Sequence, residues 1–329
     1  MRAVQYQDAG GPEVISLTEQ QDPTPGTGEV LIEVAAAGLN RADVMQRLGV
    51  YPPPKGASET PGLEVSGHVV AAGQGSGVAV EELVGKQVVA LLAGGGYAEK
   101  VTVDARHVLP VPAGVSLTDA AGLIEVAATV HSNLRGEAGV RPGDTVLVHG
   151  GTGGIGSFAL QYLRALGVQV LTTVGSAEKA SLAVELGADQ VINYREEDLA
   201  ARIQELTDGR GVDVIFDVVG AKYLETNLRS LATAGRLVII GLQGGRSAEL
   251  DLGLMLAKRL RIIATTLRAR DAEAKAEIVQ AVGEEIWPLI ESGDIAVQTD
   301  RTFPLDQAAA AQEYFDSGSH TGKILLTMQ

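Results

Sequence analysis

Five glycines lie within nine residues in the stretch HGGTGGIGS, residues 149–157. Gly151, Gly153 and Gly156 satisfy the spacing G-x-G-x-x-G. Because glycine lacks a Cβ atom, such a loop lets a phosphate approach the backbone, and a helix that begins there supplies N–H donors. The spacing by itself is weak evidence, since the chain contains 41 glycines in 329 residues. The elements on either side of the loop therefore decide its interpretation.

The glycine loop follows the apolar run TVLVH and opens a helix predicted over residues 155–166. This strand–loop–helix context is the one in which a dinucleotide pyrophosphate binds at a helix N-terminus. No Lys-Ser or Lys-Thr pair follows Gly156, which argues against the loop of nucleoside triphosphatases. The sequence therefore predicts dinucleotide binding.

The end of the next strand, VQVLTTV, indicates which dinucleotide binds. At this place an Asp or Glu would bind the ribose 2′-hydroxyl of NAD, but the strand runs into Gly175 and Ser176. A 2′-phosphate could lie at the helix N-terminus capped by Ser176 and pair with Lys179. Glu178 counts slightly against an anion, and the alternative is a simple cap beside a solvated lysine. Together these residues favour NADPH.

Six apolar runs alternate with helical segments after residue 116, which predicts an α/β, doubly wound parallel sheet buried on both faces. Before about Pro112 the chain has short β-rich runs broken by Gly and Pro, which predict a mostly antiparallel β domain. The last run, KILLTM, has no partner left in the parallel sheet, so we expect the chain to return to the first domain. Helices are predicted over 41–48, 116–134, 155–166, 177–186, 196–206, 223–231, 252–260, 272–291 and 307–315.

Composition excludes several function classes. The chain has no cysteine, so disulfides, thiol nucleophiles and sulfur-ligated zinc are absent, and its five histidines never share the i, i+3 or i+4 spacing of a helical metal site. A net charge of −15 would repel nucleic acid and anionic lipid. No run of about 18 apolar residues is present. We expect a cytoplasmic protein without metal, nucleic-acid or membrane partners.

The order of GLNRADVMQRLGVYPPP, PGLEVSGHVVAAG, GGGYAEKVTV, VLVHGGTGGIG, LGADQVINYREEDL, IIGLQGG, TTLRARD and HTGKILL resembles the zinc-free quinone oxidoreductases of the medium-chain dehydrogenase/reductase superfamily. Within them it is most similar to the subgroup that contains the tumour-suppressor-inducible quinone oxidoreductase. The resemblance implies a GroES-like catalytic domain over 1–121, completed by 268–329, a Rossmann NADPH-binding domain over 122–267, and a homodimer. Gly62-Leu63-Glu64 stands where zinc-dependent relatives have Gly-His-Glu, and Asn40 where they usually have a liganding cysteine.

The resemblance also implies which residues bind NADPH. Asn40 would contact the nicotinamide ribose and Thr129 the nicotinamide. Gly153, Gly154 and Ile155 would hold the pyrophosphate, and Ser176, Lys179 and Tyr194 would surround the 2′-phosphate. Gly241 and Leu242 would border the nicotinamide end, and Leu267 and Lys323 would close the site.

A quinone accepts a hydride readily because its product is an aromatic hydroquinone, so the cofactor supplies the difficult chemistry and the protein supplies orientation. Tyr51, in GVYPPP, is the best candidate for a catalytic side chain besides Asn40, since its hydroxyl could donate to a developing oxyanion and its ring could stack on a planar substrate. A tyrosine that only packs on the prolines, or a reaction without side-chain assistance, stays open.

Three functions are compatible with these residues. The first is an NADPH-dependent quinone oxidoreductase. The second is an NADPH-dependent alkenal or enone C=C reductase, which would use the same hydride and the same fold. The third is a non-catalytic NADPH-binding sensor or structural protein, against which the intact glycine loop and the Tyr51 segment argue weakly.

Overall fold

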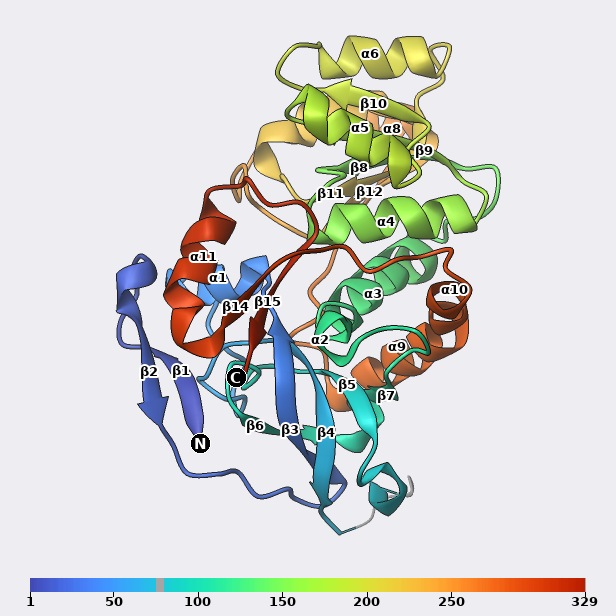
Figure 1. Cartoon of the computed structure of the whole chain (residues 1–329). Coiled ribbons are helices and arrows are strands. Elements are labelled where there is room, and N and C mark those ends of the chain that lie inside the picture. The colour runs from blue at the N-terminus through green and yellow to red at the C-terminus, as the bar shows by residue number, and fades with distance from the viewer. Residues whose placement is uncertain (75–79, 329) are drawn as a thin grey trace. The chain divides into compact units, whose positions relative to one another are not determined.

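The computed structural model describes residues 1–74 and 80–328 and divides into two compact units (Figure 1). The first unit comprises Met1–Ala128, Leu267–Gly293 and Val297–Gln329, and the second comprises Thr129–Thr266 and Asp294–Ala296. The domain boundaries expected from the sequence, after residues 121 and 267, stay a prediction. No helix in the described part of the chain is both long and apolar enough to cross a bilayer.

A seven-stranded sheet forms the centre of the first unit. Its strand order is β14-β15-β3-β4-β5-β7, with β6 paired to β3, and neighbouring strands are antiparallel except for β14 and β15. Strand β15 (Lys323–Thr327) pairs with β3 (Glu29–Gly38), which confirms that the chain returns to its first domain. The other strands are β4 (Glu64–Ala72), β5 (Gln87–Leu91), β6 (Lys100–Asp104), β7 (Val108–Pro110) and β14 (Thr299–Pro304).

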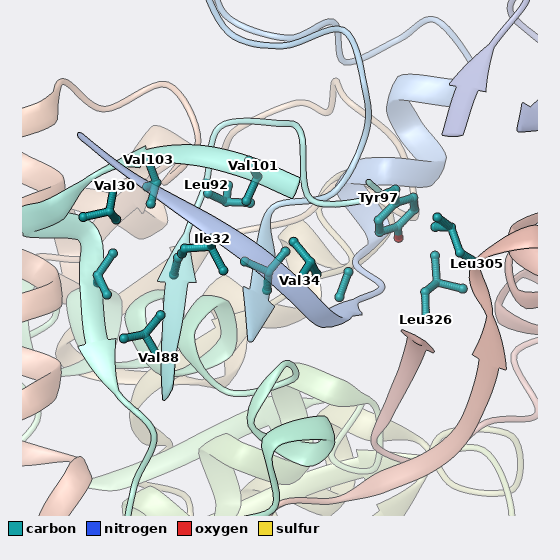
Figure 2. Packing of buried hydrophobic residues seen from close by; sticks show 14 of the residues in the cluster. Val30, Ile32, Val34, Val88, Leu92, Tyr97, Val101, Val103, Leu305 and Leu326 are labelled. Carbon is teal, nitrogen blue, oxygen red and sulfur yellow. The ribbon is translucent and has the colours of Figure 1, made fainter. Parts of the chain in front are cut away.

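The core of the first unit follows the two-residue period of β3. Val30, Ile32 and Val34 point to the same side and are buried, as expected for alternate residues of a strand. Figure 2 shows them packed with buried side chains from β5, β6 and the segments around them. Tyr97 is fully buried within the same cluster, so its hydroxyl needs a hydrogen-bond partner.

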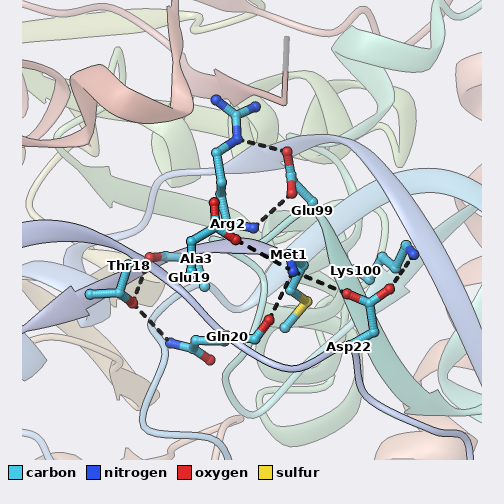
Figure 3. A network of polar contacts seen from close by, with 9 residues as sticks. All are labelled: Met1, Arg2, Ala3, Thr18, Glu19, Gln20, Asp22, Glu99 and Lys100. Carbon is cyan, nitrogen blue, oxygen red and sulfur yellow. Dashed lines mark hydrogen bonds and ion pairs between the residues drawn. The ribbon is translucent and has the colours of Figure 1, made fainter.

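The N-terminal strands form a separate two-stranded ribbon of β1 (Arg2–Tyr6) and β2 (Ile15–Glu19). Figure 3 shows how it is fastened: Arg2 donates from its backbone N–H and its Nε to Glu99, at 2.7 and 2.8 Å. Asp22 binds both the amino group of Met1 and the ammonium of Lys100. These partly exposed ion pairs fix the position of the ribbon but contribute little stability each.

The helices of the first unit lie outside its sheet. They are α1 (Arg41–Arg47), α2 (Leu117–Ala120), α3 (Ile124–His131), which runs into the second unit, α9 (Ala272–Glu285), α10 (Trp287–Glu291) and α11 (Ala308–Asp316). Two predicted helices are each divided in the structure. The helix predicted over 116–134 is interrupted after Ala120. The helix predicted over 272–291 is interrupted at Ile286, two residues before Pro288, whose missing N–H removes a hydrogen bond from the helical ladder.

The second unit contains the predicted doubly wound sheet. Six strands, all parallel, run in the order β10-β9-β8-β11-β12-β13. The strands are β8 (Thr145–His149), β9 (Gln169–Val174), β10 (Gln190–Asn193), β11 (Val212–Asp217), β12 (Leu231–Ile239) and β13 (Arg261–Ala264). The helices are α4 (Gly154–Ala165), α5 (Ala177–Glu185), α6 (Leu199–Leu206), α7 (Leu224–Ser230) and α8 (Leu252–Lys258). Helix α6 begins later than predicted because Asp198 caps it by accepting from Ala201 N–H.

The glycine loop joins β8 to α4 in a tight turn, and its glycines differ in how strictly the turn requires them. Gly150 has φ +73°, which favours glycine. A Cβ on Gly156 would lie 2.1 Å from the carbonyl oxygen of Gly150, so helix and turn can approach only without that atom. A Cβ on Gly153 would meet its nearest neighbour at an ordinary 3.7 Å. Gly156 is therefore required by packing, whereas the space beside Gly153 is open.

We expect Gly156→Ala to lower the melting temperature by several degrees, because backbone atoms must move to admit the methyl group. Gly153→Ala should leave the melting temperature nearly unchanged. Differential scanning calorimetry of the two variants beside the parent chain measures both effects. Equal melting temperatures for the two variants would contradict this account of the turn.

Candidate active site

The start of α4 offers backbone donors beside the glycine loop that the rest of the helix does not use. The first hydrogen bond of the helical ladder runs from Ser157 N–H to the carbonyl of Gly153, at 2.8 Å. The N–H groups of Gly154 and Ile155 precede that bond, as in the first turn of any helix, and suit an anion. The three residues predicted to hold a pyrophosphate thus lie together at one helix N-terminus.

The other predicted phosphate site lies where β9 meets α5. Ser176 caps α5, and its hydroxyl accepts from Lys179 N–H at 3.2 Å. Tyr194, 42% exposed, lies beside this turn, because a Cβ on Gly175 would come within 2.6 Å of the Tyr194 hydroxyl. The same test places the Arg195 side chain 3.4 Å away. The structure therefore brings Ser176 and Tyr194 to one corner and adds Arg195, a cation that sequence reasoning missed although it follows Tyr194 directly.

Three further predicted residues belong to the second unit. Thr129 is buried, and its carbonyl accepts from the Asn133 side chain at 2.8 Å. A Cβ on Gly241 would lie 2.8 Å from the carbonyl oxygen of Val218, so glycine permits a close backbone approach there. Leu242, next to it, is exposed. These positions are compatible with contacts to a flat ring.

His149, at the end of β8, is a buried sheet-end residue. Its Nε2 lies 2.8 Å from Asn227 Oδ1, and its Nδ1 lies 3.2 Å from Thr173 Oγ1. Burial lowers its pKa, so the neutral imidazole is favoured. The hydrogen bonds give His149 a structural role.

Asn40 lies inside a buried polar cluster of the first unit. Its Oδ1 accepts from Lys323 Nζ at 2.7 Å, and its Nδ2 donates to Glu64 Oε1 at 3.0 Å. Lys323 Nζ also lies 2.6 Å from Glu64 Oε1 and 3.1 Å from the carbonyl of Leu39. Lys323 thus has three acceptors for its three donors, although only 5% of it is exposed. A direct contact of Lys323 with the cofactor stays a prediction, while its hydrogen bond to Asn40 is present in the structure.

Asp43, in the first turn of α1, holds the backbone of Asn40 and of Gly62. Its carboxylate accepts from Asn40 N–H at 2.8 Å, from Tyr97 Oη at 2.9 Å and from Gly62 N–H at 3.1 Å. Burial raises the pKa of Asp43 to about 6, against the opposing effect of these donors. Asp43 thus completes a capping box with Asn40 at the start of α1.

Tyr51 lies under a buried arginine. The guanidinium of Arg268 is 5.6 Å from the centre of the Tyr51 ring, and it donates to the Tyr51 carbonyl at 3.4 Å. Among the residues that the structure describes, none forms a hydrogen bond with the Tyr51 hydroxyl. Burial raises the pKa of Tyr51, so its hydroxyl keeps its proton at neutral pH.

Arg268 was not among the predicted site residues. It also donates to the carbonyl of Ala93 at 2.8 Å and to Gln46 Oε1 at 2.7 Å, so it joins three segments of the first unit. It follows Leu267, a half-buried residue whose carbonyl accepts from Arg270 N–H. The only signal in the sequence is an arginine directly after the run RIIATTL, the predicted last strand of the parallel sheet.

Comparisons with known proteins agree with this architecture. The alcohol dehydrogenase GroES-like domain matches residues 26–113, and the zinc-binding dehydrogenase family matches residues 154–282. A quinone oxidoreductase of Pseudomonas aeruginosa is 35% identical over 99% of both chains. The crystal structure of Escherichia coli quinone oxidoreductase complexed with NADPH has a TM-score of 0.89 at 33% identity, covering 99% of this chain and 100% of that one. CurK enoyl reductase has a TM-score of 0.86 at 27% identity, covering 100% and 99%.

Identity above 30% over nearly the whole of both chains, together with the matching fold, establishes the family. The doubly wound parallel sheet of the second unit and the return of β15 to the first sheet are features that the sequence predicted. The chain belongs to the quinone oxidoreductase family of the medium-chain dehydrogenases/reductases.

Proposed function

We propose that the protein is an NADPH-dependent quinone oxidoreductase. The observation that carries the proposal is the corner after β9, where Ser176, Tyr194 and Arg195 gather and no carboxylate ends the strand. Relatives named quinone oxidoreductase, one of them crystallised with NADPH, support the same conclusion. NADPH would supply a hydride, and with one proton from the medium a quinone would become a hydroquinone.

The second unit would bind most of the cofactor. Its pyrophosphate would lie beside Gly153, on the first-turn N–H groups of Gly154 and Ile155, and the open space beside Gly153 fits this assignment. The 2′-phosphate would be held by Ser176, Lys179 and Tyr194, with Arg195 as a second cation. Thr129, Gly241 and Leu242 would contact the nicotinamide end.

The first unit would orient the reacting groups. Asn40 would contact the nicotinamide ribose through the remaining acceptor capacity of its Oδ1, in a position set by Lys323 and Glu64. Tyr51 has a hydroxyl without a hydrogen-bond partner in the described chain, and this donor suits a quinone oxygen that gains negative charge. Leu267 would border the same site.

The proposal includes a cytoplasmic location, expected from the sequence, and a homodimer, which the family resemblance implies. A C=C reductase acting on conjugated enones is the second candidate, and the likeness to CurK enoyl reductase favours it among the alternatives. Both reactions need the same hydride donor, so only the product distinguishes them. A non-catalytic NADPH-binding protein is the alternative from another class.

We expect steady oxidation of NADPH, followed at 340 nm, with 1,4-benzoquinone or 9,10-phenanthrenequinone, and slower oxidation of NADH. Failure of both quinones would exclude the proposal. In that case a saturated ketone formed from an enone would establish the C=C reductase, and NADPH binding without any turnover would establish the non-catalytic protein.

Lys179→Ala should raise KM for NADPH about 10- to 100-fold and KM for NADH little, since a charge-assisted contact worth about 1.5–3 kcal/mol is lost. Its control is Glu178→Ala, one residue earlier and exposed, which removes a charge of the opposite sign and should leave KM for NADPH equal or lower. Equal effects of Lys179→Ala on both cofactors would remove the 2′-phosphate assignment.

Tyr51→Phe should lower kcat with the quinone about tenfold, because the ring stays and one hydrogen-bond donor is lost. Tyr51→Leu removes the ring as well and should also raise KM for the quinone. Unchanged kcat in Tyr51→Phe, measured at saturating NADPH, would restrict Tyr51 to stacking.

A further inference from the structure

A cavity of about 620 Å³ opens in the first unit, and none of the residues predicted to bind the cofactor or the substrate lines it. It is lined by residues 54–58 of the loop after Tyr51, by residues 91–95, by β6 and by the segment from Arg268 to Lys275 that begins α9. Arg268 therefore contacts Tyr51 and also lines this cavity.

The side chains around the cavity are unusually basic for this chain. Two carboxylates, those of Glu29 and Asp104, are among the lining residues, against five lysine and arginine side chains. In the whole chain the balance is reversed, with 26 Lys and Arg against 41 Asp and Glu. Both carboxylates are already engaged, Glu29 with the N–H of Gly26 at 2.8 Å and Asp104 with Arg106 at 2.8 Å. The lining cations are Lys55, Lys100, Arg268, Arg270 and Lys275.

Lys275 is the most unusual of these cations. Only 6% of it is exposed, and within residues 1–74 and 80–328 no hydrogen bond or ion pair involves its ammonium group. Burial lowers the pKa of Lys275, and the nearby charge of Arg268 lowers it further. The carboxylate of Asp271 opposes this lowering of the pKa, but among the described residues it forms no ion pair with Lys275. An anion bound directly at the ammonium group would therefore be favoured.

Arg268 is the second buried cation, 4% exposed. Its three hydrogen bonds go to the uncharged acceptors Ala93 O, Gln46 Oε1 and Tyr51 O, and no described carboxylate forms an ion pair with it. A guanidinium carries five N–H donors, so two remain beyond these contacts. Two cations with spare donors thus border one cavity.

We propose that this cavity binds a small oxyanion, a phosphate or carboxylate group, between Lys275 and Arg268. Both residues present N–H donors, and charge-assisted hydrogen bonds to an oxyanion are the strongest that such groups form. The site differs from the phosphate positions of the proposed cofactor, all of which lie in the second unit.

Titration with inorganic phosphate by isothermal calorimetry tests this site, at constant ionic strength and with saturating NADP⁺ to fill the phosphate positions of the second unit. We expect about one phosphate per chain and at least tenfold weaker binding in Lys275→Met. Malonate, run in parallel, distinguishes a carboxylate ligand from a phosphate ligand. Binding of neither anion, or equal binding in Lys275→Met, overturns the proposal.

Two controls keep the result interpretable. Lys86→Met removes an exposed lysine of the first unit that does not line the cavity, and it should bind phosphate like the parent chain. Lys275→Gln, a polar variant, replaces Lys275→Met if calorimetric melting shows that the latter does not fold. Because the readout is anion binding, it requires no turnover, and failure of the proposed oxidoreductase activity leaves it intact.

Discussion

The buried ion pair of Glu64 and Lys323 is the constraint on which the first unit depends. Glu64 begins β4, Lys323 begins β15, and Asn40, held by both, precedes α1. A carboxylate and an ammonium this deeply buried are tolerable only together, because removal of one leaves the other without compensation. The position of Asn40 is therefore set by residues that lie far from it along the chain.

The same cluster gives the family resemblance a physical meaning. By the resemblance, Asn40 and the Gly62-Leu63-Glu64 segment stand where zinc-dependent relatives have metal ligands, and here Asn40 and Glu64 bind the ammonium group of Lys323 instead. The sequence indicated that metal ligands were missing at these positions. It did not indicate that Lys323 would supply a positive charge of its own, since that depends on the pairing of β15 with β3.

The fold could be predicted because its signals are local. Parallel strands buried on both faces appear as continuous apolar runs. Ser176 caps α5 by accepting a hydrogen bond from a residue only three positions later, so the helix start is visible in a short stretch of sequence. The roles of Lys323 and Arg268 could not be predicted, because their partners are 283 and 217 residues away. The glycine loop lies between these cases: its spacing was visible, but only the structure separates the packing role of Gly156 from the open space at Gly153.

The return of the C-terminal strand has a consequence for synthesis of the protein. Strand β15 lies between β14 and β3 in the first sheet, and its Lys323 neutralises Glu64. The second unit, by contrast, is almost entirely encoded between Thr129 and Thr266. During translation the parallel sheet can form on the ribosome while the first sheet is still incomplete and Glu64 lacks its partner. The part of the chain that is made first is thus the part that finishes folding last.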